Sequence, residues 1–480
     1  MSVVEPRALA RDLYASAGPT PTARIAHFGL GSFHRAHQAW FTAHSIDALE
    51  WGICAFTGRS AGLATTLRQQ GGLYTLVERS ATGDRFEVMT NLVEIHDGAD
   101  STAIIDVVSR PEIVVITTTV TEAGYRLHLD GTPRRDDAEL DHDVITLQRV
   151  TREDCLAAPV ITTVPGRLLL GLEARRRNNA GPVTIVPCDN LPRNGWVLEQ
   201  GLRQLAHMVS PQLHTWLNEN VTFASSSVDR ITPRTTSSDV DTVTGATRWL
   251  DAAPVVTEPF ASWVISGNFP AGRPRWETAG VLFVADVEPY ERRKLWLLNG
   301  AHSLLAVLGL DAGHRTVAQA ITDPRCRDWV ESFWTSARHH LPEHLELDVY
   351  CAQLLDRFQN ARIMYELEQI ASDGVMKLRT RIAPVIVGEL RVGRDCDAGA
   401  QVLATWIVRL VTIGSFPDAE GLALAAIMDT SVTPTPDLVH LVDSDLREFP
   451  SFVHRVEQLV DERVARQRTS TSNDATTQPN

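Results

Sequence analysis

The sequence predicts an α/β protein in which a Rossmann-type, doubly wound parallel sheet domain precedes a mainly α-helical C-terminal domain. An apolar strand pattern followed by a glycine turn lies close to the N-terminus, and later β-branched runs alternate with helical stretches. From about residue 287 the pattern changes to long amphipathic stretches. Because 480 residues exceed what one hydrophobic core usually organises, two domains are expected.

The first βα unit is expected in residues 24–34, where an apolar strand ends in Gly29-Leu30-Gly31 and a helix opens near Arg35. Further strands are expected at residues 51–57, 112–120 and 183–187. The β-branched composition of residues 112–120 indicates a strand that is buried on both faces, as in a parallel sheet.

The second half predicts helices at residues 290–308, 324–339, 345–357 and 402–413. We therefore expect a dinucleotide-binding domain over residues 1–286 and a helical substrate and catalytic domain over residues 287–466. Residues 467–480 are polar and lack apolar anchors, so a disordered tail is expected there.

The composition excludes several classes of function. Lys+Arg 45 against Asp+Glu 59 gives a net charge of -14, which disfavours binding to a phosphate backbone. No run approaches the roughly 18 apolar residues that a membrane span requires, and the N-terminus lacks a secretory pattern. The expectation is a cytoplasmic monomer or weak dimer that binds neither nucleic acid nor membrane.

No metal centre is expected. The six cysteines contain no CxxC pair, which indicates buried, reduced thiols and no thiolate zinc site. His34 and His37 lie three residues apart without the acidic companion that a helical zinc site brings.

The turn Gly29-Leu30-Gly31 fits a dinucleotide-binding site. Gly29 permits the tight bend and Gly31 lets the backbone approach a pyrophosphate, but His34 occupies the position of the usual third glycine. The strand at residues 51–57 ends without the acidic residue that binds a ribose 2′-hydroxyl. Arg59 is a candidate partner for a 2′-phosphate, and a solvent-facing arginine is the alternative. The expected cofactor is NAD, with NADP open.

A candidate catalytic set lies on one predicted helix. At about 100° per residue, Lys294, Asn299 and His302 fall within an arc of roughly 140°. Alcohol oxidation needs a base for the hydroxyl proton and donors for the oxygen that becomes a carbonyl. Lysine serves as that base only if its surroundings lower its pKa from about 10.4. The alternative is a surface lysine beside packing residues.

Tyr290 and Lys294 also have the Tyr-x-x-x-Lys spacing of short-chain dehydrogenases, in which tyrosine is the acid and base. We discount that interpretation because the pair begins the helical half, whereas short-chain enzymes carry it inside the nucleotide-binding domain.

Two polar pairs follow predicted strands. Asp189-Asn190 comes directly after the strand at residues 183–187, where open α/β sheets bind ligands, and Asp229-Arg230 lies in a second apolar-to-polar transition. Each pair also fits an ordinary turn. Their combination with the candidate helix favours a shared site.

At these residues the sequence resembles the polyol-specific long-chain dehydrogenases, the family that contains mannitol 2-dehydrogenase, arabinitol dehydrogenase and fructuronate reductase (mannonate oxidoreductase). The resemblance covers roughly residues 24–385, and the spacing of Lys294, Asn299 and His302 is its most specific part. Its other motifs are residues 29–38, 121–125, 188–195, 228–233 and 272–277.

The resemblance implies an active site between a Rossmann-type domain and a helical domain, without a metal. It implies that Lys294 is the general base, that Asn190 and Asn299 hold the reacting oxygen, and that His302 and Asp229 position substrate or tune the lysine. Arg230 is a further candidate for substrate binding. The cofactor-binding residues it implies are Gly29, Gly31, Ser32, Phe33, Thr121 and Glu122, besides the candidate Arg59.

The segment at residues 369–381 resembles a second substrate segment of the family. Its Lys377 and Arg381 would suit a carboxylate substrate, which favours the fructuronate reductase branch; basic residues that solvate a helix end are the alternative.

The predicted function is therefore that of a metal-independent NAD(P)-dependent oxidoreductase of polyol metabolism, which interconverts a sugar alcohol or aldonate with the ketose or keto-acid. An arabinitol or other polyol dehydrogenase is one alternative. A nucleotide-binding sensor without turnover is another.

Overall fold

The computed structural model describes residues 5–58, 61–153, 155–157, 159–412, 414 and 417–475. The chain divides into two compact units, the first ending at Glu288 and the second beginning at Pro289. This division lies two residues beyond the expected boundary after residue 286 (288 − 286 = 2). Each unit is described by itself below.

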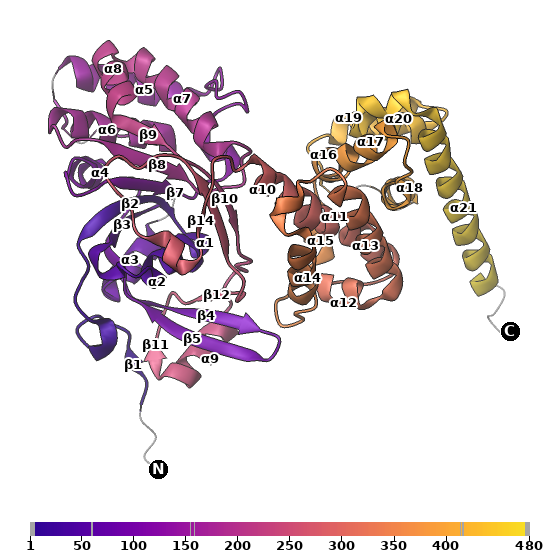
Figure 1. Cartoon of the computed structure of the whole chain (residues 1–480), viewed down its shortest axis with the longest axis horizontal. Coiled ribbons are helices and arrows are strands. Elements are labelled where there is room, and N and C mark those ends of the chain that lie inside the picture. The colour runs from indigo at the N-terminus through magenta and orange to yellow at the C-terminus, as the bar shows by residue number, and fades with distance from the viewer. Residues whose placement is uncertain are drawn as a thin grey trace. The chain divides into compact units, whose positions relative to one another are not determined.

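The first unit contains a six-stranded sheet in the order β6-β3-β2-β7-β8-β9, and every neighbouring pair of strands is parallel (Figure 1). The strands are β2 (Ala23–Leu30), β3 (Gly52–Thr57), β6 (Leu92–His96), β7 (Val115–Thr118), β8 (Val183–Pro187) and β9 (Val221–Phe223). This sheet confirms the predicted Rossmann-type fold class. The strand expected at residues 112–120 is shorter than predicted.

Side chains of the central strands alternate between two apolar cores, one on each face of the sheet. In β3, Cys54 and Phe56 pack into the core formed with helices α4–α8, while Ile53 and Ala55 pack into the core formed with α1–α3. Burial on both faces explains why these strands are continuous apolar runs in the sequence. The helices of this unit are α1 (Ser32–Ala36), α2 (Gln38–His44), α3 (Gly62–Gln69), α4 (Ser101–Val108), α5 (Ala138–Arg152), α6 (Val164–Arg177), α7 (Asn194–Val209), α8 (Pro211–Asn220) and α9 (Ser237–Thr247).

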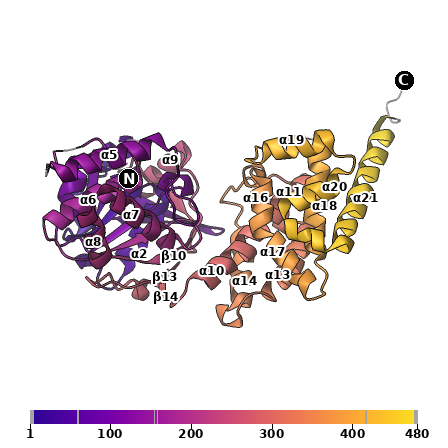
Figure 2. The same cartoon turned by 90° about the horizontal axis from the view of Figure 1, so that it is seen from above.

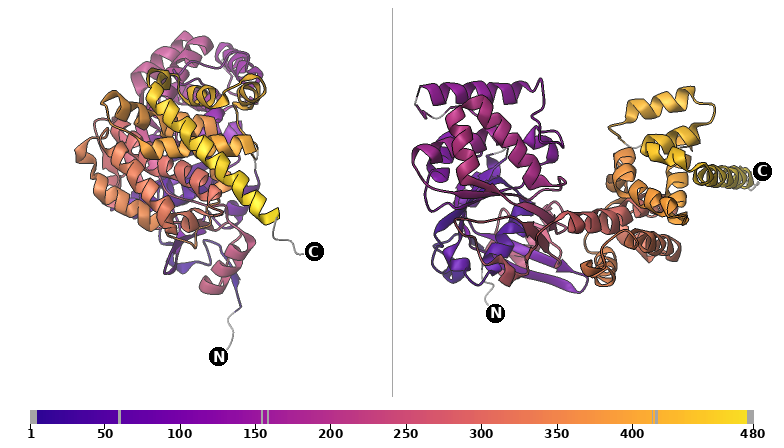
Figure 3. Two further views of the ribbon diagram at one scale, coloured as in Figure 1. Left: turned by 90° about the vertical axis from the view of Figure 1, so that its right-hand side faces the viewer. Right: turned by 45° about the horizontal axis from the view of Figure 1, so that its top comes forward.

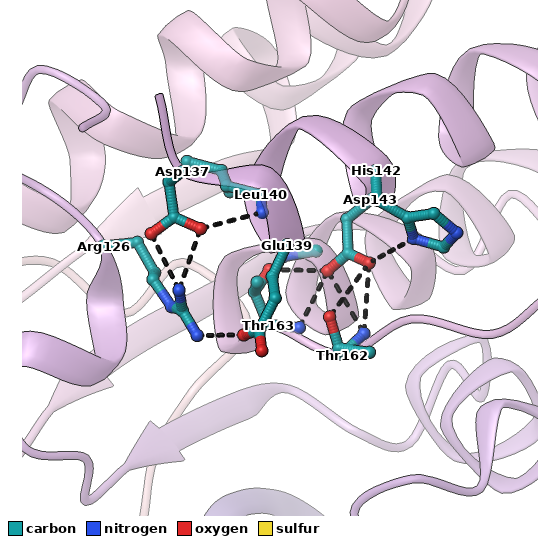
Figure 4. Close-up of polar contacts among 9 residues, drawn as sticks. Arg126, Asp137, Glu139, Leu140, His142, Asp143, Thr162 and Thr163 are labelled. Carbon is teal, nitrogen blue, oxygen red and sulfur yellow. Dashed lines mark hydrogen bonds and ion pairs between the residues drawn. The ribbon is translucent and has the colours of Figure 1, made fainter. Parts of the chain in front are cut away.

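Helices α5 and α6 are joined by a buried carboxylate (Figure 4). Asp143 of α5 is fully buried and accepts hydrogen bonds from the backbone nitrogen and Oγ1 of Thr163, both at 2.7 Å. Thr163 is in turn the N-cap of α6. One aspartate therefore fixes where the second helix begins relative to the first.

Two smaller sheets extend the first unit, and the sequence patterns did not predict them. The hairpin β4 (Tyr74–Ser80) and β5 (Gly83–Met89) pairs with β12 (Val255–Thr257). The other sheet consists of β10 (Ser225–Asp229), β13 (Ser262–Ser266) and β14 (Leu282–Phe283). Their partners are far apart in the sequence, so local periodicity carries no signal for the pairing. Two further residue pairs form the short strands β1 (Arg7–Ala8) and β11 (Trp249–Leu250).

The described part of the second unit is helical, as predicted. The apolar helix α11 (Gly300–Asp311) packs against α13, α16 and α18 (Figure 2) and against α12 and α15 (Figure 1). It is buried on almost all sides, which is the environment of a helix that is apolar all round. The remaining helices are α10 (Glu288–Arg293), α12 (Val317–Thr322), α13 (Pro324–Arg338), α14 (Leu347–Phe358), α15 (Leu367–Ala371), α16 (Gly374–Arg381), α17 (Ala383–Arg391), α18 (Asp397–Thr412), α19 (Gly421–Thr430), α20 (Pro434–Val442) and α21 (Pro450–Ala475).

The C-terminal segment differs from its prediction. Helix α21 continues to Ala475, whereas disorder was expected from residue 467, and residues 476–480 lie outside the described residues (Figure 3). Once the apolar first turns of α21 pack on α18, each further residue extends an existing helix at little cost.

Two further expectations concern the surface. Five cysteines are buried, but Cys155 is exposed, which corrects the expectation of six buried thiols. Across the described residues, none of the helices combines the length and the apolar character that a membrane span needs.

Candidate active site

The two glycines of the predicted dinucleotide turn have different structural roles. Gly29 has φ +105°, and a Cβ atom there would lie 2.2 Å from the carbonyl oxygen of Thr119, so only glycine fits. Gly31 has an extended backbone with φ −141° and ψ −168°, and its nearest obstacle would be the Gly29 oxygen at 3.7 Å. The fold therefore requires Gly29, whereas Gly31 leaves a space beside the backbone at the start of α1.

A short relay of hydrogen bonds holds this turn. Thr119 Oγ1 donates to the Gly29 carbonyl oxygen at 2.8 Å and lies 3.1 Å from His27 Nε2. Because the threonine proton is already used, His27 Nε2 must be the protonated nitrogen, and His27 Nδ1 accepts from Thr117 Oγ1 at 2.8 Å. Burial lowers the pKa of His27 to about 3, so the ring stays neutral.

The position of the missing third glycine is filled by an imidazole stack. The rings of His34 and His27 lie 3.4 Å apart at 12°, and both side chains are fully buried. Burial, followed by the neighbouring side chains of His27, Arg35 and His37, holds the pKa of His34 well below its usual range. Helix α1 ends after one turn at His37, so α1 and α2 form two short helices where a standard dinucleotide-binding helix would be continuous.

The loop after β7 carries the expected cofactor residues Thr121 and Glu122, and both are exposed. It continues into the 3₁₀ turn η3 (Glu122–Tyr125). Arg126 follows with φ +58° and donates to both carboxylate oxygens of Asp137, the N-cap of α5, at 2.8 Å (Figure 4). The loop is thus fixed at its far end by an ion pair.

A buried hydrogen-bond chain joins this loop to the end of β8. The Tyr125 hydroxyl donates to Asp189 Oδ2 at 2.6 Å and must therefore accept from Thr118 Oγ1 at 2.5 Å. Asp189 Oδ1 accepts from the backbone nitrogen of Leu191 at 2.9 Å. Burial raises the pKa of Asp189 to about 6, although the hydrogen bond from Tyr125 acts in the opposite direction. The sequence predicted Asp189 after a strand, but it did not reveal these hydrogen bonds.

Asn190, directly after Asp189, is exposed at the carboxyl end of β8. Because β2, β7 and β8 are parallel neighbours, Asn190 lies at the same sheet edge as the Gly29 turn and Thr121. The sequence analysis also missed Asn194, whose Nδ2 donates to the Ser226 carbonyl oxygen at 2.8 Å and whose Oδ1 accepts from the Ser226 nitrogen at 2.9 Å. This pair of bonds ties the Asn190 loop to β10, which ends at the buried Asp229.

Arg230 does not have the environment of a substrate-binding residue, which corrects its predicted role. Its side chain has no exposed surface, and it donates to Glu78 Oε1 at 2.7 Å and to the Ala36 carbonyl oxygen at 2.6 Å. Its guanidinium also lies 4.7 Å from the centre of the Trp40 ring. The arginine is a buried structural cation, because the fold itself uses its donors. The other predicted arginine, Arg59, lies outside the described residues.

The catalytic helix predicted in the second unit is not a regular α-helix. Residues Lys294–Asn299 form a π-helical turn, η5, between α10 and α11, and the Gly300 nitrogen donates to the Leu295 carbonyl oxygen five residues earlier. In a π-helix residues five apart follow one another along the axis, whereas in an α-helix they diverge by roughly 140°. Lys294 and Asn299 therefore share a face, and His302 follows on it one α-helical turn later. The π register therefore gives the three residues a narrower arc around the helix axis than the roughly 140° of an α-helix.

His302 is buried among aromatic rings, with ring centres 4.7 Å from Phe358 and 5.1 Å from Tyr365. Arg381 of α16 donates from Nη1 to Ser303 Oγ at 3.1 Å and to the Asn299 carbonyl oxygen at 3.4 Å. The second predicted substrate segment therefore packs directly on the predicted catalytic helix.

Lys377, one turn before Arg381, donates from Nζ to the Ile370 carbonyl oxygen at 2.9 Å. Burial lowers the pKa of Lys377, and the nearby Arg381 lowers it further.

The chain contains only two lysines, and both lie in the predicted substrate and catalytic segments. Of the 45 basic residues, Lys294 and Lys377 are the only lysines in the sequence, and the other 43 are arginines (45 − 2 = 43). Arginine does not lose its proton in proteins, whereas a lysine amine does so when its surroundings lower its pKa. The two lysines stand at the positions for which the sequence predicts a base and a substrate contact.

One group of described residues has the composition of a metal site, namely His314, Asp323 and Cys326, whose ligand atoms lie within 4.8 Å of one another. Asp323 caps α13 and pairs with Arg325 at 3.0 Å and with His314 at 3.1 Å. Burial raises the pKa of the Cys326 thiol to about 11. These contacts explain the cluster as a helix cap, and the expectation of no metal stays a prediction.

Two family models match consecutive parts of the chain. Residues 23–278 match the family model described as the mannitol dehydrogenase Rossmann domain, and residues 286–411 match the mannitol dehydrogenase C-terminal domain. D-mannonate oxidoreductase of Escherichia coli (strain K12) is 34% identical over 395 residues, which cover 80% of this chain and 79% of that protein. D-arabinitol 4-dehydrogenase of Ralstonia nicotianae is 34% identical over 459 residues, which cover 90% and 93%.

Among solved structures, the mannitol 2-dehydrogenase of Pseudomonas fluorescens, in a ternary complex with NAD and D-mannitol, has a TM-score of 0.77 and 30% identity. The match covers 99% of this chain and 98% of that chain.

Proposed function

The chain belongs to the mannitol dehydrogenase family, and on that premise we propose that it is an NAD(P)-dependent oxidoreductase that needs no metal and interconverts a sugar alcohol or aldonate with the ketose or keto-acid. Relatives named for mannonate, arabinitol and mannitol support this range of substrates. The observation that carries the proposal is the π-helical turn, which gives Lys294, Asn299 and His302 a common face.

The cofactor is proposed to bind at the Gly29 turn. The residues present fit a dinucleotide. Gly31 has no side chain, and there is space beside its backbone at the start of α1, so a pyrophosphate could approach the backbone nitrogens there. Ser32, Phe33, Thr121 and Glu122 are the proposed additional contacts. When bound, the nicotinamide supplies the hydride acceptor for oxidation and the hydride donor for reduction.

Lys294 is the proposed general base for oxidation. Its neutral amine takes the proton of the reacting hydroxyl, and the same group returns that proton when the carbonyl is reduced. The Asn299 amide donates a hydrogen bond to the oxygen whose charge changes during the reaction. His302, fixed between Phe358 and Tyr365, orients the amine.

Other proposed roles rest on the sequence motifs. Asn190 as a second donor to the reacting oxygen and Asp229 as a substrate-positioning residue follow from the family resemblance. Lys377 and Arg381 are proposed to favour a substrate with a carboxylate, because α16 packs beside the Asn299 end of the catalytic turn.

The proposal is tested first with a substrate panel of mannitol, arabinitol, fructose, fructuronate and tagaturonate, each with both nicotinamide cofactors. A higher kcat/KM with a hexuronate than with the polyols would support the fructuronate reductase branch. Binding of NADH without turnover of any member would favour the nucleotide-binding sensor.

The base is tested with Lys294→Ala and Lys294→Arg. Both variants are expected to keep NADH binding while kcat falls by about two to four orders of magnitude, since general base catalysis contributes 10²–10⁴-fold. Arginine keeps the charge but cannot release its proton, so an active Lys294→Arg variant would refute the role of base.

The amine can also be observed directly. With only two lysines in the chain, selective ¹³C labelling of lysine gives two Cε signals, and Lys294→Ala assigns them. The signal of Lys294 should titrate at the pH of the acid limb of kcat; a titration at an unrelated pH would contradict the mechanism.

A further inference from the structure

Helix α13 packs directly on the π-helical turn of the second unit. The indole Nε1 of Trp334 donates to the carbonyl oxygen of Leu297 at 2.8 Å, and both residues are buried. A Cβ atom on Gly300 would lie 2.8 Å from Cε1 of Phe333, the residue before Trp334. These contacts lie where the hydrogen-bond ladder changes from the π register of η5 to the α register of α11.

We propose that Trp334 is a positioning residue that holds residues Lys294–Asn299 in the π register and thereby keeps Lys294 on the face of Asn299 and His302. The inference rests on the proposed function, because it concerns the residues assigned to proton transfer.

The competing conformation is a regular α-helix. In that helix the Gly300 nitrogen would donate to the Trp296 carbonyl, four residues earlier, whereas here it donates to the Leu295 carbonyl. A change of register would therefore rotate the backbone between Leu295 and Gly300, which includes the Leu297 carbonyl. The Trp334 N–H holds that carbonyl in its present position, so it stabilises the π register relative to the α-helix.

Two further contacts act at the same junction. Glycine at position 300 lets the ring of Phe333 approach the backbone, and alanine there would need the ring to move. On another side, Arg381 donates to the Asn299 carbonyl oxygen at 3.4 Å. The junction is therefore packed on two sides, by α13 and by α16.

The geometric consequence is specific. If the turn reverted to an α-helix, Lys294 and Asn299 would again diverge by roughly 140°, although neither residue would have changed. A misplaced base lowers the rate of the chemical step, whereas cofactor binding by the first unit is unaffected. The predicted signature is a fall in kcat with an unchanged affinity for NADH.

The test is Trp334→Phe, which removes the N–H donor and keeps an aromatic ring. We expect kcat with the best substrate of the panel to fall by about ten- to a hundredfold. The Kd for NADH should stay within about twofold, as a control on the first unit. Trp329→Phe, on the same helix at a half-buried position, should leave kcat unchanged.

A spectroscopic measurement separates positioning from simple destabilisation. In Trp334→Phe the ¹³Cε signal of Lys294 should shift and its titration should move with the acid limb of kcat, while the signal of Lys377 serves as an internal reference. Trp334→His keeps a ring N–H and should recover part of the lost kcat, and it is the second variant if Trp334→Phe does not fold.

Two results would overturn the inference. One is a folded Trp334→Phe with wild-type kcat and an unmoved Lys294 signal; the other is a crystal structure of the wild-type protein with a regular α-helix across residues 294–299. Should Lys294→Ala itself retain turnover, the proposed function fails. Should Lys294→Ala be inactive while Trp334→Phe is normal, only the positioning role fails.

Discussion

Substitution of Gly31 by alanine separates cofactor binding from folding at the dinucleotide turn. The two glycines of this turn differ in what a methyl group would meet: a Cβ on Gly29 would lie 2.2 Å from a backbone oxygen, whereas a Cβ on Gly31 would lie 3.7 Å from its nearest neighbour. Gly31 also has an extended backbone that alanine adopts without strain. The fold tolerates alanine at position 31, so any loss must come from the ligand.

The expected magnitudes follow from this geometry. Gly31→Ala should change the free energy of unfolding by less than about 1 kcal/mol, in the stabilising direction, because alanine restricts the unfolded chain. If a pyrophosphate occupies the space beside Gly31, the methyl group should weaken NADH binding at least tenfold, which is about 1.4 kcal/mol. Gly29→Ala should instead lose stability as well, since a positive φ on a non-glycine residue alone costs of order 1–3 kcal/mol.

The assay is a calorimetric titration of NADH combined with thermal unfolding of each variant. Gly245→Ala is the matched control, because a Cβ there meets nothing within 4 Å and the residue lies in α9, far along the chain from the turn. Gly31→Ala with wild-type NADH affinity would refute the assignment of this turn to the cofactor. Equal losses of stability in Gly31→Ala and Gly29→Ala would refute the geometric argument.

Two further predictions concern buried groups of the first unit. The pKa of Asp189 is about 6 in the folded protein, against an ordinary value of 3.8 in an unfolded chain. The protonated carboxyl therefore contributes fully to stability below pH 3.8, and this contribution is lost as the pH rises through 6. Over that range the free energy of unfolding should fall by about 3 kcal/mol in the wild type but not in Asp189→Asn, which cannot ionise. The unfolding midpoint of the variant should therefore rise relative to that of the wild type, and parallel pH profiles would contradict this. Arg175→Met removes a buried guanidinium that donates to five backbone carbonyl oxygens and should destabilise by about 3–5 kcal/mol. Arg176→Met should lower the free energy of unfolding by only about 1 kcal/mol, because Glu173 still forms its ion pair with Arg177. Equal effects of Arg175→Met and Arg176→Met on urea unfolding would refute this distinction.

The parallel sheet could be predicted from the sequence because its signals are local. Strands buried on both faces must be apolar throughout, and the run at Val183–Pro187 coincides with β8 for that reason. The carboxyl ends of parallel neighbours meet at one edge, so Asn190 and Thr121 could be assigned to the same edge from their places in the chain. The hairpin β4–β5 and the sheet around β10 depend on pairings between distant segments, and they were missed.

The roles of the arginines could not be predicted in this way. Arg230 follows the motif residue Asp229, and its sequence position suggested a substrate contact, yet its side chain is enclosed by Glu78 and Trp40. Arg175 lies in a run of three arginines that resembles a solvated helix end, yet it is fully buried and donates to five backbone carbonyl oxygens. Whether an arginine binds a ligand or the backbone depends on which carbonyl and carboxylate oxygens surround it, and those come from elsewhere in the chain.

The sequence by itself determined the chemistry that this protein has available: a glycine turn after the first strand and a lysine, an asparagine and a histidine at fixed spacing. Spacing along a helix gives directions only if the helix is regular, and the arc of roughly 140° assumed an α-helix. The tertiary structure decided otherwise, because Trp334 and the packing of α13 on Gly300 stabilise a π-helical turn between Lys294 and Asn299. That hydrogen bond joins residues 37 positions apart, and no local pattern in the sequence could reveal it.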